Sequence, residues 1–561
     1  MDGVATDYRS LVFPYRRSPD QDAAAAARRP VVVAGAGPAG LATAVDLAQG
    51  GVRVVLLDDD DRLSTGSRAI CFAKRTLEIF DRLGCGEPMA QKGVGWNTGR
   101  VFLGDEQVYS FSLLTEAGHH RPAFVNLQQY YVEGFLLDRA RALPNLEIRW
   151  RNRVAGISQD GQEVTLTVET PDGPYWLRCE YLVAADGARS PIRRALGHES
   201  RGQTFRDRFL IADVRMEADF PAERWFWFDP PFHPGQSVLL HRQPDGVWRI
   251  DFQLGWDADP VAERLPERVV PRVQALLGPD AKFELEWVSV YTFSCQRMAS
   301  FRDGRVLFTG DCAHGVSPFG ARGANSGVQD AENLAWKLRM VLTGAAPDRL
   351  LDTYASEREF AADENILHST RSTDFITPKS DVSRTFRDAT LLLARDCAFA
   401  RQLVNSGRLS TPSTLAGSPL NTPDEDCFAP GLIPGAPCTD APVRHGGHDS
   451  WLLDHVGNEF TLLHFSNGAA IDAGQLGAMG NLRRNNIPVW TVVVEPLGAT
   501  PRSIDGVRVV EEDGLVSRRF DAQPGTTYLL RPDQHVCARW RSFDPARIQA
   551  ALAHATANVH I

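Results

Sequence analysis

The first residues that could do chemistry form a glycine-rich segment, Gly35-Ala36-Gly37-Pro38-Ala39-Gly40. It lies between an apolar run at 31–34, which predicts a buried strand, and a helix-compatible stretch at 39–49. Glycines at this spacing let a backbone approach a pyrophosphate, whose charge the N–H groups at a helix N-terminus can bind. Asp58 ends the next apolar run, where an acid can accept hydrogen bonds from ribose hydroxyls. The segment predicts dinucleotide binding; the alternative is a tight turn of small packing residues.

A second segment combines an acid with a glycine-rich loop. Gly310-Asp311-Cys312-Ala313-His314 follows a predicted strand at 305–309, and Pro318 to Gly327 leads into a predicted long helix at 324–342. Asp311 can accept hydrogen bonds from a ribityl chain. The loop can present backbone N–H groups to the N1–C2=O edge of a flavin, which becomes negative on reduction.

A third segment, Tyr181 to Ser190, ends a predicted buried strand in Asp186 and Gly187. An acid at the carboxyl end of a parallel strand can lie beside a bound cofactor. The alternative is a helix cap, because Ser190-Pro191 also begins a helix.

The elements that must position these residues begin with a strand–helix–strand unit at 31–57, typical of a parallel α/β sheet. In the middle of the chain, strand-like runs at 237–241 and 248–254 flank the turn Pro244-Asp245-Gly246 and predict an antiparallel hairpin. Prolines are frequent between 412 and 447, which predicts a linker, and later apolar runs predict a third, small α/β unit.

Composition limits the classes of function. The 561 residues are too many for one core, and the net charge of -10 argues against nucleic acid or an anionic membrane as the main partner. No apolar run is long enough to span a membrane, and the N-terminus has no signal-peptide pattern. The nine cysteines form no C-x-x-C pair and no metal-ligand cluster, so we expect reduced thiols, no metal and a cytoplasmic location.

The three segments, in their order along the chain, resemble the FAD fingerprints of the single-component FAD-dependent aromatic hydroxylases, which have the p-hydroxybenzoate hydroxylase fold. The matching ranges are 31–58, 181–193 and 305–339, and the run from Asp330 to Leu338 extends the match. The family usually has proline where this chain has Phe360, a difference of structural weight. The length and tail resemble phenol hydroxylase and 3-(3-hydroxyphenyl)propionate hydroxylase, with Tyr528 to Asp533 similar to the closing strand of their thioredoxin-like domain.

The resemblance implies an α/β fold: a Rossmann-like FAD-binding domain with an inserted antiparallel β-sheet substrate domain, plus a C-terminal thioredoxin-like α/β domain. Without a C-x-x-C this last domain is expected to be structural and to support a homodimer. The expected boundaries are an N-terminal arm at 1–29, the FAD-binding domain at 30–200 and 295–375, the substrate sheet at 201–294, a helical segment and linker at 376–445, and the thioredoxin-like domain at 446–561.

The resemblance also implies an activity, the hydroxylation of a small phenolic or amino- or carboxy-substituted aromatic with FAD, NADH or NADPH, and O2, through a C4a-hydroperoxyflavin. The chain has no second G-x-G-x-x-G, so NAD(P)H is expected to dock transiently on the FAD face. The alternatives are a monooxygenase that tailors a polyketide or antibiotic, and a flavin-binding sensor without hydroxylase activity. Trp225 to Pro230 approaches the W-x-W-x-I-P box of flavin-dependent halogenases, but Asp229 replaces its isoleucine.

By the resemblance, three groups of residues contact FAD. Gly35, Gly37, Gly40, Asp58 and Arg68 are expected at the ADP half, Gln129, Asp186 and Asp311 along the ribityl–pyrophosphate stretch, and Pro318, Gly320 and Asn325 at the isoalloxazine. The further expected contacts are Pro38, Ala39, Asp59, Ser67, Ala69, Gly310, Gly323 and Ala324.

Four residues are candidates for the substrate side. Alternation in the strand at 248–254 puts Arg249 and Asp251 on one face. If that face roofs the flavin cavity, Arg249 could bind a substrate carboxylate and Asp251 could serve as base or orienter. The alternative is an Arg–Asp pair on a solvated face. Tyr291 is expected near the substrate or in the core, and His241 as a proton relay or a satisfied surface histidine.

Overall fold

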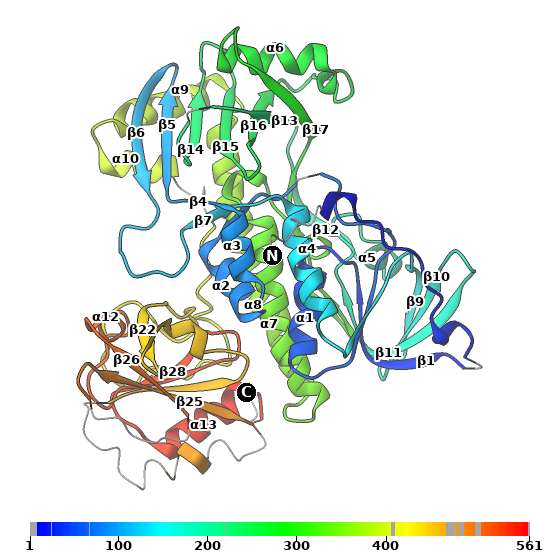
Figure 1. The fold of residues 1–561 in the computed structure, drawn as a ribbon, viewed down its shortest axis with the longest axis vertical. Coiled ribbons are helices and arrows are strands. Elements are labelled where there is room, and N and C mark those ends of the chain that lie inside the picture. The colour runs from blue at the N-terminus through cyan, green and yellow to red at the C-terminus, as the bar shows by residue number, and fades with distance from the viewer. Residues whose placement is uncertain are drawn as a thin grey trace.

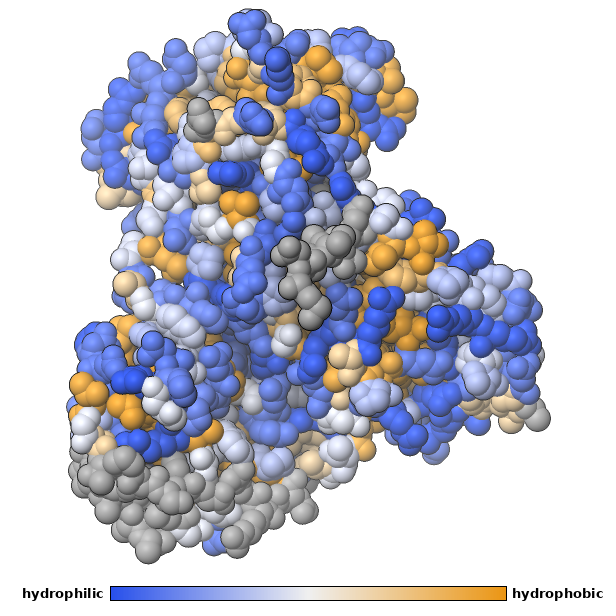
Figure 2. All heavy atoms as spheres, in the orientation of Figure 1, coloured by the Kyte–Doolittle hydropathy of each residue, from blue (hydrophilic) through white to orange (hydrophobic). Residues whose placement is uncertain are grey.

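The computed structural model describes residues 8–23, 25–66, 68–218, 220–405, 410–466, 477, 479–481, 487–499 and 506–558. Figure 1 shows three bodies: an antiparallel sheet at the top, an α/β body at the centre and right, and a C-terminal α/β body at the lower left. The face seen in Figure 2 is mostly hydrophilic, with apolar atoms in separate patches. No helix among the described residues is long and apolar enough to cross a membrane.

The central body is built on the predicted strand–helix–strand unit. Strand β1 (Ala27–Ala34) leads through α1 (Pro38–Gln49) to β2 (Val54–Leu57). The path of its sheet is β19-β20-β11-β1-β2-β8, with β8 (Leu146–Arg149), β11 (Tyr175–Ala184), β19 (Arg302–Asp303) and β20 (Val306–Phe308). Because β2, β11, β1 and β20 pair in parallel, their carboxyl ends bring all three sequence segments to one edge of the sheet.

The N-terminal arm is shorter than the sequence predicted. The expected arm extended to residue 29. Strand β1 begins earlier, at Ala27, because Ala27–Arg29 already pair with Leu177–Cys179 of β11. The preceding residues pack on the same body, with Phe13 stacked on Trp150 at 4.4 Å between ring centroids.

The upper sheet has the order β17-β13-β16-β15-β14-β5-β6. Its strands are β5 (Thr98–Leu103), β6 (Glu106–Ser112), β13 (Arg208–Met216), β14 (Arg224–Phe228), β15 (Ser237–Arg242), β16 (Val247–Leu254) and β17 (Phe283–Tyr291). The predicted hairpin is confirmed as β15 and β16. The expected limits of 201–294 miss β5 and β6, because β5 joins by parallel pairing to β14, which is far away in the sequence.

The two faces of this sheet have different neighbours. Trp248, Ile250 and Phe252 pack with α6 (Pro266–Leu277), in one apolar cluster that includes Val269 and Val273. The polar residues of β16 point to the opposite face, toward the central body. Burial of the apolar face on α6 therefore fixes which face the sheet presents to the cavity described below.

Two long helices connect the bodies. Helix α7 (Gly323–Leu342) packs against α1, and α8 (Leu350–Ile376) runs beside α7 and ends near the upper sheet (Figure 1). Helices α9 (Asp381–Ala394) and α10 (Ala398–Asn405) follow, as expected for the helical part of 376–445.

The C-terminal sheet has the order β23-β22-β26-β25-β24-β27-β28. Its strands are β22 (Pro442–His445), β23 (His448–Trp451), β24 (Phe460–Phe465), β25 (Val489–Pro496), β26 (Val507–Glu511), β27 (Thr527–Leu530) and β28 (Val536–Trp540), and α13 (Pro545–Ala555) follows. The expected boundary at 446 is late, because β22 already belongs to the sheet. The expected closing strand at 528–533 is also not the last, since β28 pairs beyond it. Whether the domain is thioredoxin-like stays a prediction.

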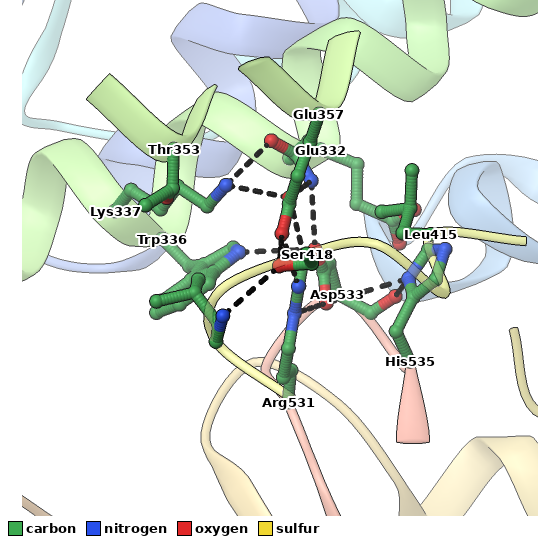
Figure 3. A network of polar contacts seen from close by, with 12 residues as sticks. Glu332, Trp336, Lys337, Thr353, Glu357, Leu415, Ser418, Arg531, Asp533 and His535 are labelled. Atoms are coloured by element: carbon green, nitrogen blue, oxygen red, sulfur yellow. Dashed lines mark hydrogen bonds and ion pairs between the residues drawn. The ribbon is translucent and has the colours of Figure 1, made fainter. Parts of the chain in front are cut away.

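A buried network of charges joins the C-terminal body to α7 and α8 (Figure 3). Arg531 donates to Glu357 on α8 with N···O distances of 2.7 and 3.0 Å, and also to Asp533. Lys337 on α7 donates to the same Glu357 at 2.7 Å, and Trp336 Nε1 donates to Asp533 at 3.1 Å. Every charged group in this set is at most 1% exposed, so each depends on its partners for the polar contacts that water would supply.

Replacing Arg531 by methionine should lower the free energy of unfolding by about 3–5 kcal/mol, because Glu357 and Asp533 would stay buried with fewer partners. The first transition in urea, followed by tryptophan fluorescence, measures this loss. The matched control is Arg153→Met, whose ion pair with Glu169 is 55% and 48% exposed and should cost under about 1 kcal/mol. Equal losses for the two variants would show that the network does not hold the domains together.

Candidate cofactor and substrate site

A cavity of about 930 Å³ lies between the carboxyl edge of the central sheet, the N-terminus of α7 and the polar face of the upper sheet. The three sequence segments meet in it. The sequence-predicted cofactor residues that line it are Gly35, Gly37, Pro38, Ala39, Asp58, Asp59, Arg68, Ala69, Gln129, Asp186, Gly310, Asp311, Pro318, Gly323, Ala324 and Asn325. The predicted substrate-side residues that line it are His241, Arg249, Asp251 and Tyr291.

Two of the predicted residues that the structure describes are placed differently. Gly40 and Gly320 are buried and are not among the described residues that line the cavity. A Cβ on Gly40 would lie 1.9 Å from the carbonyl oxygen of Gly35, so Gly40 lets α1 pack against the loop. Ser67 lies outside the described residues.

The glycine loop after β1 is shaped by close backbone approach. Gly35 has φ +107°, and a Cβ there would lie 2.3 Å from the carbonyl oxygen of Ala185. A Cβ on Gly37 would meet no atom within 4 Å, so the backbone there is open toward the cavity. The result is a concave wall at the N-terminus of α1, where backbone N–H groups can receive a phosphate.

Asp58 is held at the end of β2. Its Oδ2 accepts a hydrogen bond from Ala36 N at 2.5 Å, and its Oδ1 accepts one from Asp60 N at 2.9 Å. Burial raises the pKa of Asp58 to about 6. The carboxylate therefore closes the glycine loop as well as lining the cavity.

A buried carboxylate on α7 holds the second segment. Asp330 accepts hydrogen bonds from Gly310 N at 3.0 Å, His314 Nε2 at 2.7 Å and Arg358 Nε at 2.6 Å. Burial opposes ionisation of Asp330, but the charges of His314 and Arg358 outweigh it and lower its pKa to about 2. This bond places His314 away from the cavity and in a structural role, and it fixes the turn that carries Asp311.

Asp186 and Asp311 offer oxygens along the middle of the cavity. Asp186 Oδ2 accepts hydrogen bonds from Ser190 Oγ at 2.7 Å and Ile192 N at 3.1 Å, whereas its buried Oδ1 has no hydrogen-bond partner among the described residues. Asp311 is exposed to the cavity that it lines, and desolvation by the protein around it raises its pKa. The Asp–Gly segment thus caps the helix α5 (Pro191–Ala195) and also lines the cavity, and contact of Asp186 with a cofactor stays a prediction.

Gln129 and Asn325 are bonded mainly to the protein around the cavity. Gln129 Oε1 accepts a hydrogen bond from Ala69 N at 3.1 Å, which holds the lining segment near 69. Asn325 Oδ1 accepts one from Ala73 N at 2.8 Å, and its Nδ2 donates to Cys71 O at 2.9 Å. Asn325 thereby ties the start of α7 to the strand β3 (Cys71–Ala73).

The polar face of the upper sheet carries a row of directly opposed residues. In register, Arg224 of β14 faces His241 of β15, His241 faces Arg249 of β16, and Arg249 faces Asp213 of β13. Arg249 donates to both oxygens of Asp213 at 2.8 Å, so its charge is already matched within the protein. The pair is buried toward the cavity, and the expected alternative of a solvated face is wrong.

His241 and Asp251 form a second pair in this part of the cavity. His241 Nε2 lies 3.4 Å from Asp251 Oδ2, and burial, followed by the charge of Arg224, lowers the pKa of His241 to about 4. His241 is only 2% exposed, so it is not a surface histidine. Tyr291 ends β17 beside Phe293, and burial raises its pKa well above the ordinary value.

Arg224 is one of the lining residues that the sequence did not predict. Trp225 to Pro230 stands out in the sequence for its likeness to a halogenase box, whereas the arginine that opens this strand belongs to no motif. The sequence feature that could have indicated Arg224 is a single cation at the start of a short apolar strand.

The donor set fits FAD. The glycine wall and the α1 N-terminus suit a pyrophosphate, Asp58 suits ribose hydroxyls, and the unpartnered Oδ1 of Asp186 suits a polyol chain. Residues 28–369 match the family described as "FAD binding domain". The chain belongs to this FAD-binding family. FAD is therefore its cofactor, as the sequence predicted.

Relatives and solved structures extend the comparison. Para-nitrophenol 4-monooxygenase of Pseudomonas sp. (strain WBC-3) is 32% identical over 339 residues, which are 58% of this chain and 82% of the relative. 6-Methylpretetramide 4-monooxygenase of Streptomyces rimosus is 31% identical over 93% of this chain and 92% of the relative. The crystal structure of the flavin-dependent monooxygenase PieE with FAD and substrate has a TM-score of 0.79 at 21% identity, covering 95% of this chain and 99% of that one. This last likeness concerns the fold alone.

Replacing Asp330 by asparagine should cost about 3–5 kcal/mol of stability, because Arg358 would remain buried beside a group without charge. Urea unfolding of purified protein measures it, and the exposed Asp257→Asn provides the control, with a change within about 0.5 kcal/mol. If Asp330→Asn unfolds at the same urea concentration as the control, Asp330 does not hold the Gly310 turn.

Proposed function

We propose that this protein hydroxylates a small phenolic or amino- or carboxy-substituted aromatic, with NADH or NADPH as reductant and O2 as oxidant. The observation that carries the proposal is one continuous cavity that joins the dinucleotide loop to a polar, protein-enclosed sheet face. The relatives named as monooxygenases of nitrophenol and of 3-(3-hydroxyphenyl)propionate support this reaction class. Because the same cavity must also hold the flavin, the remaining space favours a single ring.

The roles of the cofactor-side residues follow from their positions. FAD, when bound, supplies the redox chemistry, with a hydride from NAD(P)H and oxygen from O2. The N–H groups of Gly37 and Ala39 would bind its pyrophosphate and Asp58 its ribose, while Asp186 and Asp311 would hold the ribityl stretch. The N-terminus of α7, at Gly323 and Ala324, would stabilise negative charge at the flavin edge.

The substrate-side residues would hold a ring and move its proton. His241 is neutral at physiological pH and lies beside Asp251, so it can accept the proton of a substrate hydroxyl while Asp251 orients the imidazole. Tyr291 keeps its proton and can donate a hydrogen bond to a substrate oxygen. Loss of the hydroxyl proton makes the ring richer in electrons, which favours attack by an electrophilic oxygen.

A second candidate is the tailoring of a polyketide. The match to 6-methylpretetramide 4-monooxygenase extends over 92% of that relative's length, which supports this alternative. Substrate-stimulated NADH and NADPH oxidation with coupled product, measured for single-ring and polycyclic phenols side by side, separates the two. Stimulation by polycyclic substrates alone would replace the main proposal, and oxidation indifferent to every arene would contradict both.

A homodimer and a cytoplasmic location are also proposals. Phe386 on α9 and Phe399 on α10 are each 60% exposed, and a second copy would cover them. All the described cysteines are free thiols, which suits a reducing compartment.

Asp311→Ala should give largely colourless protein, because the ribityl stretch would lose its acceptor. Flavin content per polypeptide, from the absorbance of purified protein, measures this. Asp257→Ala, on the exposed loop after β16, should keep full flavin content. Yellow Asp311→Ala protein with full flavin content would remove Asp311 from the FAD site.

His241→Gln should lower kcat by about 10²–10⁴-fold with unchanged flavin content, because no neutral base would face the substrate hydroxyl. A base with a pKa of about 4, below the ordinary value of a histidine, stays unprotonated above that pH. The kcat/KM of the unmutated enzyme should therefore be flat as pH falls from about 8 to about 5. A fall in kcat/KM centred near the ordinary histidine pKa would contradict this prediction. It would show that the pKa of His241, if His241 is the base, is not lowered.

A further inference from the structure

Arg224 is a buried cation at the cavity that forms no ion pair with a carboxylate in the part of the chain that the structure describes. It begins β14, lines the cavity and is 3% exposed. Its Nε and Nη1 are enclosed and have no hydrogen-bond partner among the described residues. Burial lowers the pKa of its guanidinium, but an arginine keeps its charge at neutral pH.

Most other buried arginines among the described residues are paired with carboxylates, whereas Arg322 donates to the side-chain oxygen of Asn365. Arg249, two strands away in the same row, donates to both carboxylate oxygens of Asp213. Arg358 has Asp330, and Arg531 has Glu357 and Asp533. The protein therefore balances buried guanidinium groups with acids elsewhere, and the unbalanced Arg224 requires an explanation.

The surroundings of Arg224 compensate its charge only in part. The guanidinium carbon lies 4.9 Å from the centre of the Phe226 ring, a cation–π contact worth roughly 0.5–2 kcal/mol. Asp251 attracts Arg224 electrostatically, but its carboxylate lies beside His241. A carboxylate in the cavity would supply the opposite charge that this guanidinium lacks among the described residues.

Resting on the proposed function, we propose that Arg224 binds a carboxylate carried by the aromatic substrate. The register supports the size of such a substrate. Arg224 is directly opposite His241, and opposed residues on neighbouring strands lie roughly 4.5–5.5 Å apart at Cβ. That separation is close to the span of one ring, so a hydroxyl at His241 and a carboxylate at Arg224 belong on the same ring or one short substituent away. Arg224 thereby takes the role that the sequence suggested for Arg249.

The test compares two probes that differ in charge. Isothermal titration calorimetry of the FAD-loaded enzyme gives Kd values for 3-hydroxybenzoate and for uncharged 3-methylphenol at neutral pH. The unmutated enzyme should bind 3-hydroxybenzoate at least tenfold more tightly. Arg224→Met should raise the Kd of 3-hydroxybenzoate at least tenfold, about 1.4 kcal/mol, and change that of 3-methylphenol less than about twofold.

A matched control lies on the same pair of strands. Arg242, next to His241, is exposed and lies against Trp248 on the opposite face of the sheet. Arg242→Met should leave both Kd values unchanged. Arg224→Lys should give an intermediate Kd for 3-hydroxybenzoate, because the charge stays while the two-pronged geometry is lost.

Several outcomes would overturn the inference. One is equal weakening of both probes by Arg224→Met, as expected if Arg224 binds a phenolate or supports the sheet. Another is a clear fall in Tm for ligand-free Arg224→Met, since removing an unpaired buried cation should leave Tm equal or higher. If Arg224→Met does not fold, the two Kd values of the unmutated enzyme still test the inference. Binding of 3-hydroxybenzoate no tighter than that of 3-methylphenol refutes the carboxylate site. An enzyme that hydroxylates 3-methylphenol without that preference refutes this inference alone, whereas one that responds to no arene refutes the proposed function.

Discussion

The buried carboxylate of Asp330 is the constraint on which the cofactor side of the structure depends. It joins the Gly310 backbone and the His314 ring of one segment to the Arg358 guanidinium of α8. Gly310 has φ +66°, a left-handed conformation that glycine adopts without strain, and the bond from its N–H to Asp330 fixes that turn. The position of Asp311 in the cavity is therefore set by charges that lie behind it.

Helix α7 carries this constraint to the rest of the molecule. Its N-terminus faces the cavity, Asp330 lies two turns in, and Trp336 and Lys337 further along take part in the network with the C-terminal body. Glu332, between them, pairs with Arg75 of α2 (Lys74–Arg82) at 2.7 Å. Paired buried charges are costly to separate. Helix α7 therefore couples the cofactor loop to the position of the C-terminal body, which does not line the cavity.

The substrate side of the cavity depends on the geometry of the upper sheet, whereas the cofactor side depends on local turns. Side chains alternate between faces, and burial of the apolar face against α6 leaves the polar row to roof the cavity. Within that row, charge matching is complete at Arg249 and incomplete at Arg224. The difference follows from strand order, since β13 brings Asp213 to Arg249, whereas β5 presents Gly99 opposite Arg224.

The sequence by itself determined the α/β class, the FAD segments and the residues of the β15–β16 hairpin, because each is a contiguous strand–turn–helix or strand–turn–strand pattern. It also placed Asp58, Asp186 and Asp311 at strand ends that meet at one edge of the sheet. Tertiary structure decided the addition of β5 to the upper sheet, the pairing of Arg249 with Asp213 and the network around Arg531. Those contacts join residues far apart in the chain, and the order of strands and the packing of helices, which no local pattern encodes, decide which charges become neighbours. For the same reason only the folded chain reveals that no carboxylate among the described residues forms an ion pair with Arg224.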